Sequence, residues 1–247
     1  MPPDLKACSE KSEIEITVVF DSEAVGSEWE VGWGVSCLVS VPGKQYLFDT
    51  GENPFTLAHN LNLMGIKPAN LDLVFLSHEH FDHIGGLNYI LKENPSVPVM
   101  IHKYFSGSFK QKWKKQGVNL IETIALARYD NFVYTTGPLG ETMKEQALVL
   151  RTPQGVALMS GCAHPEITTM VAYTSKVLHL PVRIVIGGFH LMDTRAGKIK
   201  LIAHELQKQG VEQVYPCHCT GTEAVEIFRE IFNEGCKPLK AGESVSF

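Results

Sequence analysis

The sequence predicts a mixed α/β fold in which two β-sheets lie face to face and helices cover their outer sides. Short apolar segments typical of strands alternate with amphipathic segments typical of helices. The strands come in two runs, and each run is followed by helices. No linker rich in Gly, Ser or Pro divides the two halves. We therefore expect one domain over residues 1–247.

The first half of the chain supplies the first run of strands. Alternation of apolar and polar residues predicts a half-buried strand at 14–20, and a Pro-Gly-Lys turn predicts a hairpin. The helix that begins at Pro54 has Asn53 as its cap and Gly65 as its end. The expected strands are 14–20, 35–41, 45–48, 71–76 and 97–101, and the expected helices are 54–64, one beginning in 86–92, and an irregular one in 103–116.

The second half repeats this pattern. Two strands joined by Thr-Pro-Gln-Gly are followed by a helix with a proline near its start. An amphipathic helix that ends at Gly210 separates the next two strands. The expected strands are 132–135, 147–151, 156–160, 182–186, 211–215 and an edge strand at 243–247, and the expected helices are 165–178, 198–209 and 222–233.

Composition limits the classes of function. The 247 residues are 44% apolar, which is enough for a sizeable core. A net charge of −5 argues against a nucleic-acid partner. No stretch reaches the length of a membrane span, and the first residues lack the basic and apolar regions of a secretion signal. The six cysteines show no disulfide-framework pattern. We expect a cytoplasmic protein with no membrane partner, possible as a homo-oligomer.

The strongest functional signal is a cluster of metal-binding side chains directly after an apolar strand. Residues 78–83 are His-Glu-His-Phe-Asp-His, so three histidines and one aspartate fall within six positions. Imidazole and carboxylate groups suit zinc, iron and manganese. The pattern predicts that a buried strand delivers His78, His80, Asp82 and His83 to a metal site.

Three further histidines follow predicted strands. His164, His190 and His218 each stand in a turn just after a strand, beside glycines that permit tight turns. Strand ends at one edge of a sheet are where sites collect in layered α/β folds, so all three are candidate ligands. The remaining four histidines have positions more typical of surface or structural residues: His59, His102, His179 and His204.

Cysteines and lysines near these motifs have two interpretations each. Cys162, Cys217 and Cys219 could supply soft thiolate ligands, but buried cysteine is more often a small apolar residue. Of the three, Cys219 has the best placement for ligation. The basic run at 103–115 could steer an anionic substrate, although a solvated helix face is the commoner meaning of such a run.

These motifs, in order along nearly the whole chain, resemble the metallo-β-lactamase superfamily. The resemblance rests on His78-x-His80-x-Asp82-His83, the Phe-Asp-Thr-Gly turn at 48–51, and the phrases around His164, His190 and His218. Within the superfamily, the chain resembles a subgroup of metal-dependent hydrolases and dihydropterin ribofuranosylaminobenzene 5′-phosphate synthase-like proteins. The resemblance implies a four-layer αββα sandwich with a dinuclear site at one edge of the paired sheets.

The resemblance also implies a ligand set. His78, His80 and His164 would hold the first metal, and Asp82, His83 and His218 would hold the second. Asp49 would orient these ligands by hydrogen bonds. The superfamily usually has a bridging aspartate after the strand at 182–186, where this chain has His190 and, nearby, Asp193. His190 could therefore bind one metal alone or point toward substrate, and we favour the first.

The site predicts a reaction class. A metal ion with an open coordination position lowers the pKa of bound water toward neutrality. Asp82 is a candidate general base, and His190 is a second candidate catalytic residue. We expect one or two zinc ions, with manganese or iron as alternatives, and hydrolysis of a phosphoester or ester in a small anionic substrate. The alternatives are an iron-dependent redox enzyme, a pterin-related phosphate synthase, and a non-catalytic protein that uses its metals to anchor a ligand.

Overall fold

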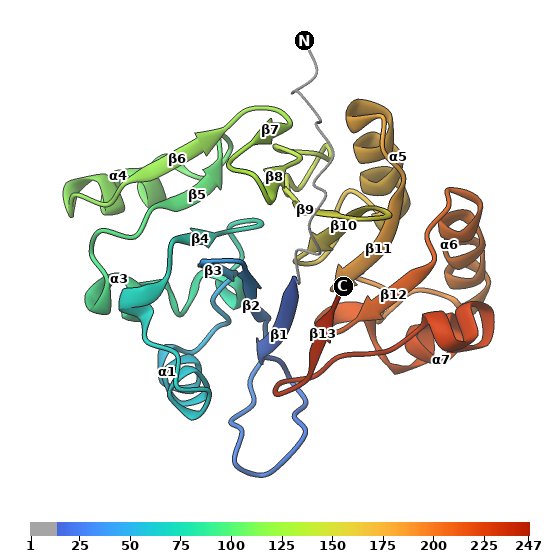
Figure 1. Cartoon of the computed structure of the whole chain (residues 1–247), viewed down its shortest axis with the longest axis horizontal. Helices are drawn as coiled ribbons and strands as arrows, with labels where there is room; N and C mark the ends of the chain where they lie inside the picture. The colour runs from blue at the N-terminus through green and yellow to red at the C-terminus, as the bar shows by residue number, and fades with distance from the viewer. Residues whose placement is uncertain (1–13) are drawn as a thin grey trace. The chain divides into compact units, whose positions relative to one another are not determined.

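A computed structural model of the chain describes residues 14–247, which form two compact units with one β-sheet each (Figure 1). The N-terminal unit contains residues 14–124 and 240–247. The C-terminal unit contains residues 125–239. Two sheets were expected, and both are present. The first residues of the chain, on which the expectation about a secretion signal depends, lie outside the described residues. A single domain over 1–247 stays a prediction.

The sheet of the N-terminal unit has seven strands in the order β13-β1-β2-β3-β4-β5-β6. From β3 to β6 the strands are parallel, so their carboxyl ends share one edge of the sheet. The strands are β1 (Glu15–Phe20), β2 (Ser36–Val41), β3 (Lys44–Phe48), β4 (Leu73–Phe75), β5 (Val99–His102), β6 (Leu120–Thr123) and β13 (Ser244–Ser246).

Helices of this unit bury apolar side chains against the sheet. Asn53 caps the first helix by accepting a hydrogen bond from the Phe55 backbone N–H at 2.9 Å, as its position before a proline predicts. Leu57 and Leu61 of this helix are fully buried with strand residues such as Val74. The helices are α1 (Pro54–Leu63), α2 (Phe81–Ile84), α3 (Leu87–Glu93) and α4 (Gly107–Lys115), with a 3-10 turn η1 (Pro68–Asn70).

The sheet of the C-terminal unit has six strands in the order β12-β11-β10-β9-β8-β7. Strands β10, β11 and β12 are parallel neighbours, and the others are antiparallel. The strands are β7 (Ala127–Arg128), β8 (Val133–Thr135), β9 (Leu148–Thr152), β10 (Gly155–Ser160), β11 (Val182–Gly187) and β12 (Gln213–Pro216).

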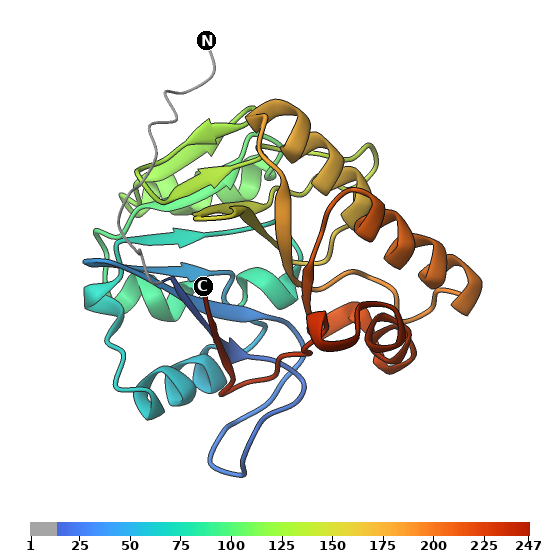
Figure 2. The same ribbon diagram turned by 45° about the vertical axis from the view of Figure 1, so that its right-hand side comes forward.

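Three long helices lie along this second sheet and contact one another in sequence order (Figures 1 and 2). Their buried faces pack with strand residues such as Val185 and Val214 into one apolar core. The helices are α5 (Ile167–Leu178), α6 (Ala196–Lys208) and α7 (Thr222–Phe232), with 3-10 turns η2 (His218–Thr220) and η3 (Asn233–Gly235). Among the described residues, no helix has the length and apolar character needed to cross a membrane.

The structure differs from the sequence expectations in a few elements. Two strands were missed: β6, which is only partly buried at the sheet edge, and β7, which has two exposed residues. Both lack the strong apolar pattern on which strand prediction depends. The segment expected as an irregular helix is a regular one, α4, because Ser106 caps it and Phe109 and Trp113 bury one face.

Candidate metal centre

The residues from His78 to His83 lie at the carboxyl end of β4, as the sequence predicted. The first part is an extended loop, and the second part is a short helix, α2, which begins after His80. A loop was expected throughout, because four residues are too few to give a helical periodicity in the sequence. Side chains from the two parts come together: the ring centroids of His78 and His83 lie 4.1 Å apart.

His78 and His80 present a pair of nitrogens to one another. The Nε2 atom of His78 lies 3.1 Å from Nδ1 of His80. Two imidazole ligands of one tetrahedral zinc ion, each about 2.0–2.1 Å from the metal, would have nitrogens about 3.3 Å apart. The spacing of this hydrogen-bonded pair is therefore close to the spacing of two imidazole ligands of one zinc ion. The other nitrogen of His78, Nδ1, lies 2.9 Å from Ser77 Oγ.

Asp49 lies behind these histidines and is fully buried. Its carboxylate accepts hydrogen bonds from the backbone N–H of Ser77 at 2.7 Å and from the Ser77 hydroxyl at 2.6 Å. The same carboxylate pairs with Nδ1 of His83 at 2.7 Å. Asp49 thus contacts one histidine directly and reaches His78 through Ser77. A carboxylate in this position fixes the ring orientation and tautomer of ligand histidines.

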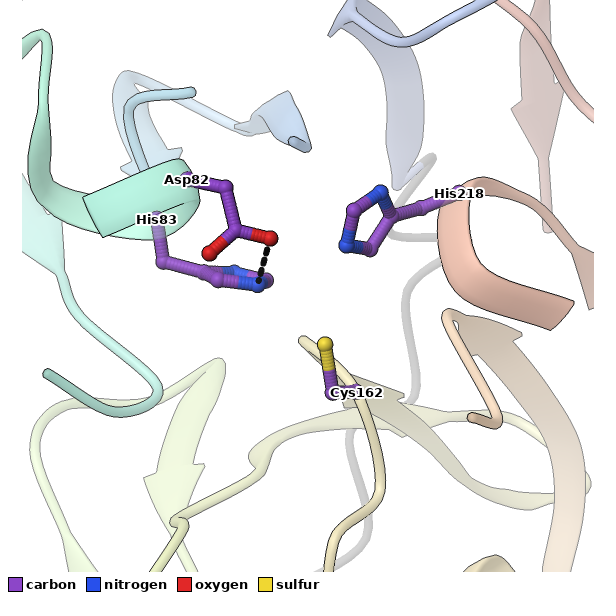
Figure 3. Close-up of side chains that lie close together, drawn as sticks. All are labelled: Asp82, His83, Cys162 and His218. Atoms are coloured by element: carbon purple, nitrogen blue, oxygen red, sulfur yellow. Dashed lines mark ion pairs between the residues drawn. The ribbon is translucent and has the colours of Figure 1, made fainter. Parts of the chain in front are cut away.

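His83 is the titratable group that this arrangement perturbs most clearly. Burial lowers its pKa, but the charges and hydrogen bonds of Asp49 and Asp82 outweigh burial and raise the pKa of His83 to about 10. Asp82 Oδ2 lies 3.4 Å from His83 Nε2, the ion pair that Figure 3 marks with a dashed line. Figure 3 also draws Cys162 and His218, which belong to the C-terminal unit.

Glu79, which lies between His78 and His80, has a structural role that the sequence did not reveal. Its carboxylate accepts hydrogen bonds from the backbone N–H and the hydroxyl of Ser106, the latter at 2.5 Å. Ser106 in turn caps α4. The loop that carries His78 and His80 is therefore tied to the start of α4. Lys112, Lys114 and Lys115 of α4 are exposed, and Lys110 and Lys114 pair with Glu122 at 2.7 and 2.9 Å.

In the C-terminal unit, the turns after β10, β11 and β12 carry His164, His190 and His218. Because these strands are parallel neighbours, their ends share one edge of the sheet. The ring centroids of His164 and His190 lie 4.6 Å apart. Four non-glycine residues in these turns have positive φ: Ala163 at 53°, Glu166 at 67°, His190 at 51° and His218 at 50°. Such backbone strain clusters at functional sites.

A buried glutamate that sequence reasoning missed organises the first of these turns. Glu145 is fully buried, and its Oε1 accepts backbone hydrogen bonds from Gly161, Cys162 and Ala163 at 2.9–3.1 Å. Its Oε2 accepts a fourth from His164 at 2.9 Å. One carboxylate therefore holds the backbone of the whole turn. A carboxylate between two predicted strands gave no local signal of this role.

Two thiols lie beside His190. The Cys219 thiol hydrogen-bonds Cys162 and the His190 side chain, and the hydrogen bond from Cys162 is the main reason that its pKa lies well below the usual range. Burial opposes this shift. The hydrogen bond to Cys219 correspondingly raises the pKa of His190, again against burial. None of the cysteines in the described residues forms a disulfide.

The other four histidines are structural or exposed, as expected. His59 Nε2 bonds the Glu28 carbonyl at 2.8 Å, and His179 ends α5 on the surface. His204 lies on the exposed face of α6. His102 is buried, and its Nδ1 accepts the Tyr104 backbone N–H at 3.2 Å.

A pocket of about 260 Å³ lies beside the histidine turns of the C-terminal unit. His164 and His190 line it together with Phe189 and the first part of α6. Lys198 brings an ammonium group to its wall and pairs with Glu166 at 2.6 Å. Asp193, the nearest carboxylate in sequence to His190, is exposed.

Comparison of the sequence with models of protein families agrees with the fold described above. The model of the metallo-beta-lactamase superfamily matches residues 32–169. The chain belongs to the metallo-β-lactamase superfamily, whose members are metal-dependent hydrolases and related enzymes. Membership implies binding of a divalent metal, and the candidate ligands described above agree with it.

A curated relative from Methanocaldococcus jannaschii is named 7,8-dihydropterin-6-methyl-4-(beta-D-ribofuranosyl)-aminobenzene-5′-phosphate synthase. It is 30% identical over 263 aligned positions, which cover 87% of this chain and 90% of that protein. The subgroup resemblance inferred from the sequence is thereby confirmed.

Solved structures confirm the fold class. A metal-dependent hydrolase of the beta-lactamase superfamily superimposes with a TM-score of 0.80 at 26% identity, covering 94% of this chain and 98% of that one. The metallo-beta-lactamase fold protein YhfI from Bacillus subtilis gives a TM-score of 0.70 at 14% identity, covering 96% and 100%. The chain thus has the mixed α/β fold with two sheets and helices that this superfamily shares.

Proposed function

We propose that this protein is a metal-dependent hydrolase that cleaves a phosphoester or ester bond in a small anionic substrate. The observation that carries the proposal is the nitrogen pair of His78 and His80, 3.1 Å apart. These two ligands, with His83 oriented by Asp49 at 2.7 Å, form a preorganised half of a metal centre. The ligands of the C-terminal unit complete the centre in this proposal.

The proposed ligands are divided between the units. His78 and His80 bind the first metal with His164, and Asp82 and His83 bind the second with His218. His190 binds one metal in place of the bridging aspartate. We propose zinc, in one or two copies, because imidazole and carboxylate ligands suit it, with manganese or iron as alternatives. A metal held by these residues would lower the pKa of a bound water and so supply the nucleophile.

The chain's own residues supply proton transfer and substrate binding. Asp82 is half-buried and pairs with His83. Its carboxylate is the proposed general base, which takes up a proton from the attacking water. The pocket beside His164 and His190 accommodates the substrate, and Lys198 faces its anionic group. A substrate phosphoryl oxygen would compete with Glu166 for this ammonium group.

The primary test compares two histidine variants. His80→Ala removes one proposed ligand, and His204→Ala removes a histidine from the exposed face of α6. Metal content is measured by elemental mass spectrometry, and turnover is measured with bis(p-nitrophenyl) phosphate and a lactone panel. We expect His80→Ala to lose bound metal and turnover, and His204→Ala to keep both. Near-normal metal content and turnover in His80→Ala would refute the assignment.

Substrate charge has its own test. Lys198→Met should raise KM for an anionic phosphoester while leaving kcat nearly unchanged, because the lysine contributes to binding rather than to the chemical step. Lys200→Met, a charge change elsewhere on α6, is the matched control. Equal KM values in the two variants would rule out this role of Lys198.

A pterin-related phosphate synthase is the second candidate function. The specific observation in its favour is the relative with that name, which aligns with 87% of this chain. Incubation with a dihydropterin-methyl donor that carries a phosphoryl leaving group and with a ribofuranosylaminobenzene 5′-phosphate, followed by mass spectrometry, would detect the joined product and the phosphate released from the donor. Formation of that product without phosphoester hydrolysis would favour the synthase over the hydrolase.

A further inference from the structure

Two thiols and one imidazole converge within the C-terminal unit. The Sγ atoms of Cys162 and Cys219 and a ring nitrogen of His190 all lie within 4.8 Å of one another. Both cysteines are buried, at 3% and 4% exposed. The backbone N–H of His190 also donates to Cys219 Sγ at 3.3 Å. We call these three residues the thiol–imidazole cluster.

The backbone is shaped to bring these side chains together. A Cβ atom added to Gly188 would lie 2.3 Å from the Gly161 carbonyl oxygen and 2.7 Å from Cys219 Sγ. Only glycine therefore allows the turns after β10 and β11 to approach the Cys219 sulfur this closely. Thr220 fixes the third turn, because its hydroxyl accepts the Phe189 N–H at 3.1 Å and donates to the Cys217 carbonyl at 2.9 Å.

The donor set has the chemistry of a metal site. Thiolate and imidazole are the ligands that zinc prefers, and two thiolates neutralise one divalent ion. At a zinc–sulfur distance of about 2.3 Å, two ligands of a tetrahedral ion are about 3.5–3.8 Å apart. The cluster, with its donors within 4.8 Å, needs a contraction of at most about 1.0–1.3 Å.

Cys217 provides an internal comparison. It lies in the same turn, and it is buried to a similar degree, at 6% exposed. Its sulfur does not belong to the cluster that includes Cys162 and Cys219. Cys217 is thus buried nearly as deeply as the other two cysteines but does not join the cluster. The feature that sets Cys162, His190 and Cys219 apart is the short distance between their donor atoms.

We propose that Cys162, His190 and Cys219 bind a thiophilic divalent ion of the zinc class. This ion is the one that the proposed function assigns to His190, so the two thiolates are further ligands of that metal. His190 is exposed, so a fourth coordination position is accessible from the pocket side. The cluster adjoins His218, which has a ring nitrogen within 4.8 Å of the Cys162 sulfur. This inference goes beyond the proposed hydrolysis, since thiolate ligation within the C-terminal unit requires no particular reaction.

The test uses Co²⁺ alone as a probe of the full-length, metal-free protein under a phosphine reductant. Thiolate ligation gives a near-ultraviolet sulfur-to-cobalt charge-transfer band, which histidine ligation does not give. The variants are Cys162→Ser, Cys219→Ser and the double variant, with Cys217→Ser as the matched control. We expect the band in the wild type and in Cys217→Ser, about half of it in each single variant because one of two thiolates is lost, and none in the double variant.

Two results would overturn the proposal. One is a wild-type protein that binds Co²⁺ without the charge-transfer band. The other is a band of full intensity in the double variant. Should a variant fail to fold, X-ray absorption of the zinc-loaded wild type decides: sulfur neighbours at about 2.3 Å support the cluster, and their absence refutes it. Neither readout measures turnover, so failure of this inference is distinguishable from failure of the proposed hydrolysis.

Discussion

The carboxylate of Asp49 lies 2.7 Å from Nδ1 of His83, and both side chains are fully buried. The same carboxylate accepts two hydrogen bonds from Ser77, which contacts His78. A single acidic side chain therefore orients two of the candidate metal ligands. In metal sites, such carboxylates make the histidine more basic as a ligand and fix which of its nitrogens faces the metal.

Asp49→Asn should weaken zinc affinity. The asparagine amide is nearly the same size as the carboxylate. The substitution removes the negative charge that pairs with His83, and it replaces one of the two oxygens that accept hydrogen bonds from Ser77. We expect a loss of about 10–100-fold in zinc affinity, the usual effect of removing such a partner. Competition with a chromophoric chelator measures it. Asp72→Asn, at an exposed carboxylate that accepts the Gln45 N–H, is the control, and equal affinities in the two variants would contradict the role of Asp49.

Stability of the metal-free protein should fall as pH rises above neutrality. His83 has a folded-state pKa raised from 6.5 to about 10, so its protonated form favours the folded state. The contribution is fully present below pH 6.5 and is lost as pH approaches 10. Urea unfolding of the chelator-treated protein across this window measures the decline. A free energy of unfolding that is flat or rising with pH would contradict the ion pair, and Asp49→Asn should flatten the decline.

Replacing Glu145 should destabilise the C-terminal unit strongly. Glu145→Ala leaves four buried backbone N–H groups without their acceptor, which we expect to cost about 3–5 kcal/mol. Glu145→Gln should fall between the wild type and Glu145→Ala, since the amide keeps one acceptor oxygen. Chemical unfolding gives these values. Glu141→Ala, at an exposed site, should change stability by less than about 0.5 kcal/mol, and a similar value for Glu145→Ala would refute this account.

Two glycine-to-alanine substitutions should have opposite effects. Gly188→Ala places a methyl group 2.3 Å from the Gly161 carbonyl oxygen, so the turn must move, at a cost of about 1–3 kcal/mol. Gly197 lies in α6 with no atom near the added Cβ, so Gly197→Ala should stabilise by about 0.5–1 kcal/mol. Thermal unfolding compares the two. A neutral Gly188→Ala would show that this close approach is not required.

The placement of the candidate ligands after strand ends was predictable, because apolar strands followed by histidine-rich turns leave local signals. The cluster at His78–His83 follows a buried strand, and His164, His190 and His218 each follow a strand of one parallel set. The hairpin of β2 and β3 and the cap of α1 were likewise predicted from turn and cap residues. The joint ligation of metals by residues of both units stays a prediction.

Other features depend on contacts between distant parts of the chain. Glu145 bonds the turn at Gly161–His164, and nothing in the residues around Glu145 indicates that partner. The approach of the Cys162 and Cys219 sulfur atoms likewise depends on the turns after parallel strands lying side by side. Glu79 stands among the candidate ligand residues and holds Ser106, a partner that nothing in the residues around Glu79 indicates.

The pairing of β1 with β13 has a consequence for folding. Glu15 lies opposite Ser246, so the edge of the N-terminal unit's sheet closes only when residues far from β1 in the sequence are available. Contacts across such long sequence separations form slowly, because the loop between them loses entropy before the pairing stabilises it. During synthesis, the C-terminal unit can fold while β1 still lacks its outer neighbour. That edge of the sheet stays uncovered until residues 244–246 have left the ribosome.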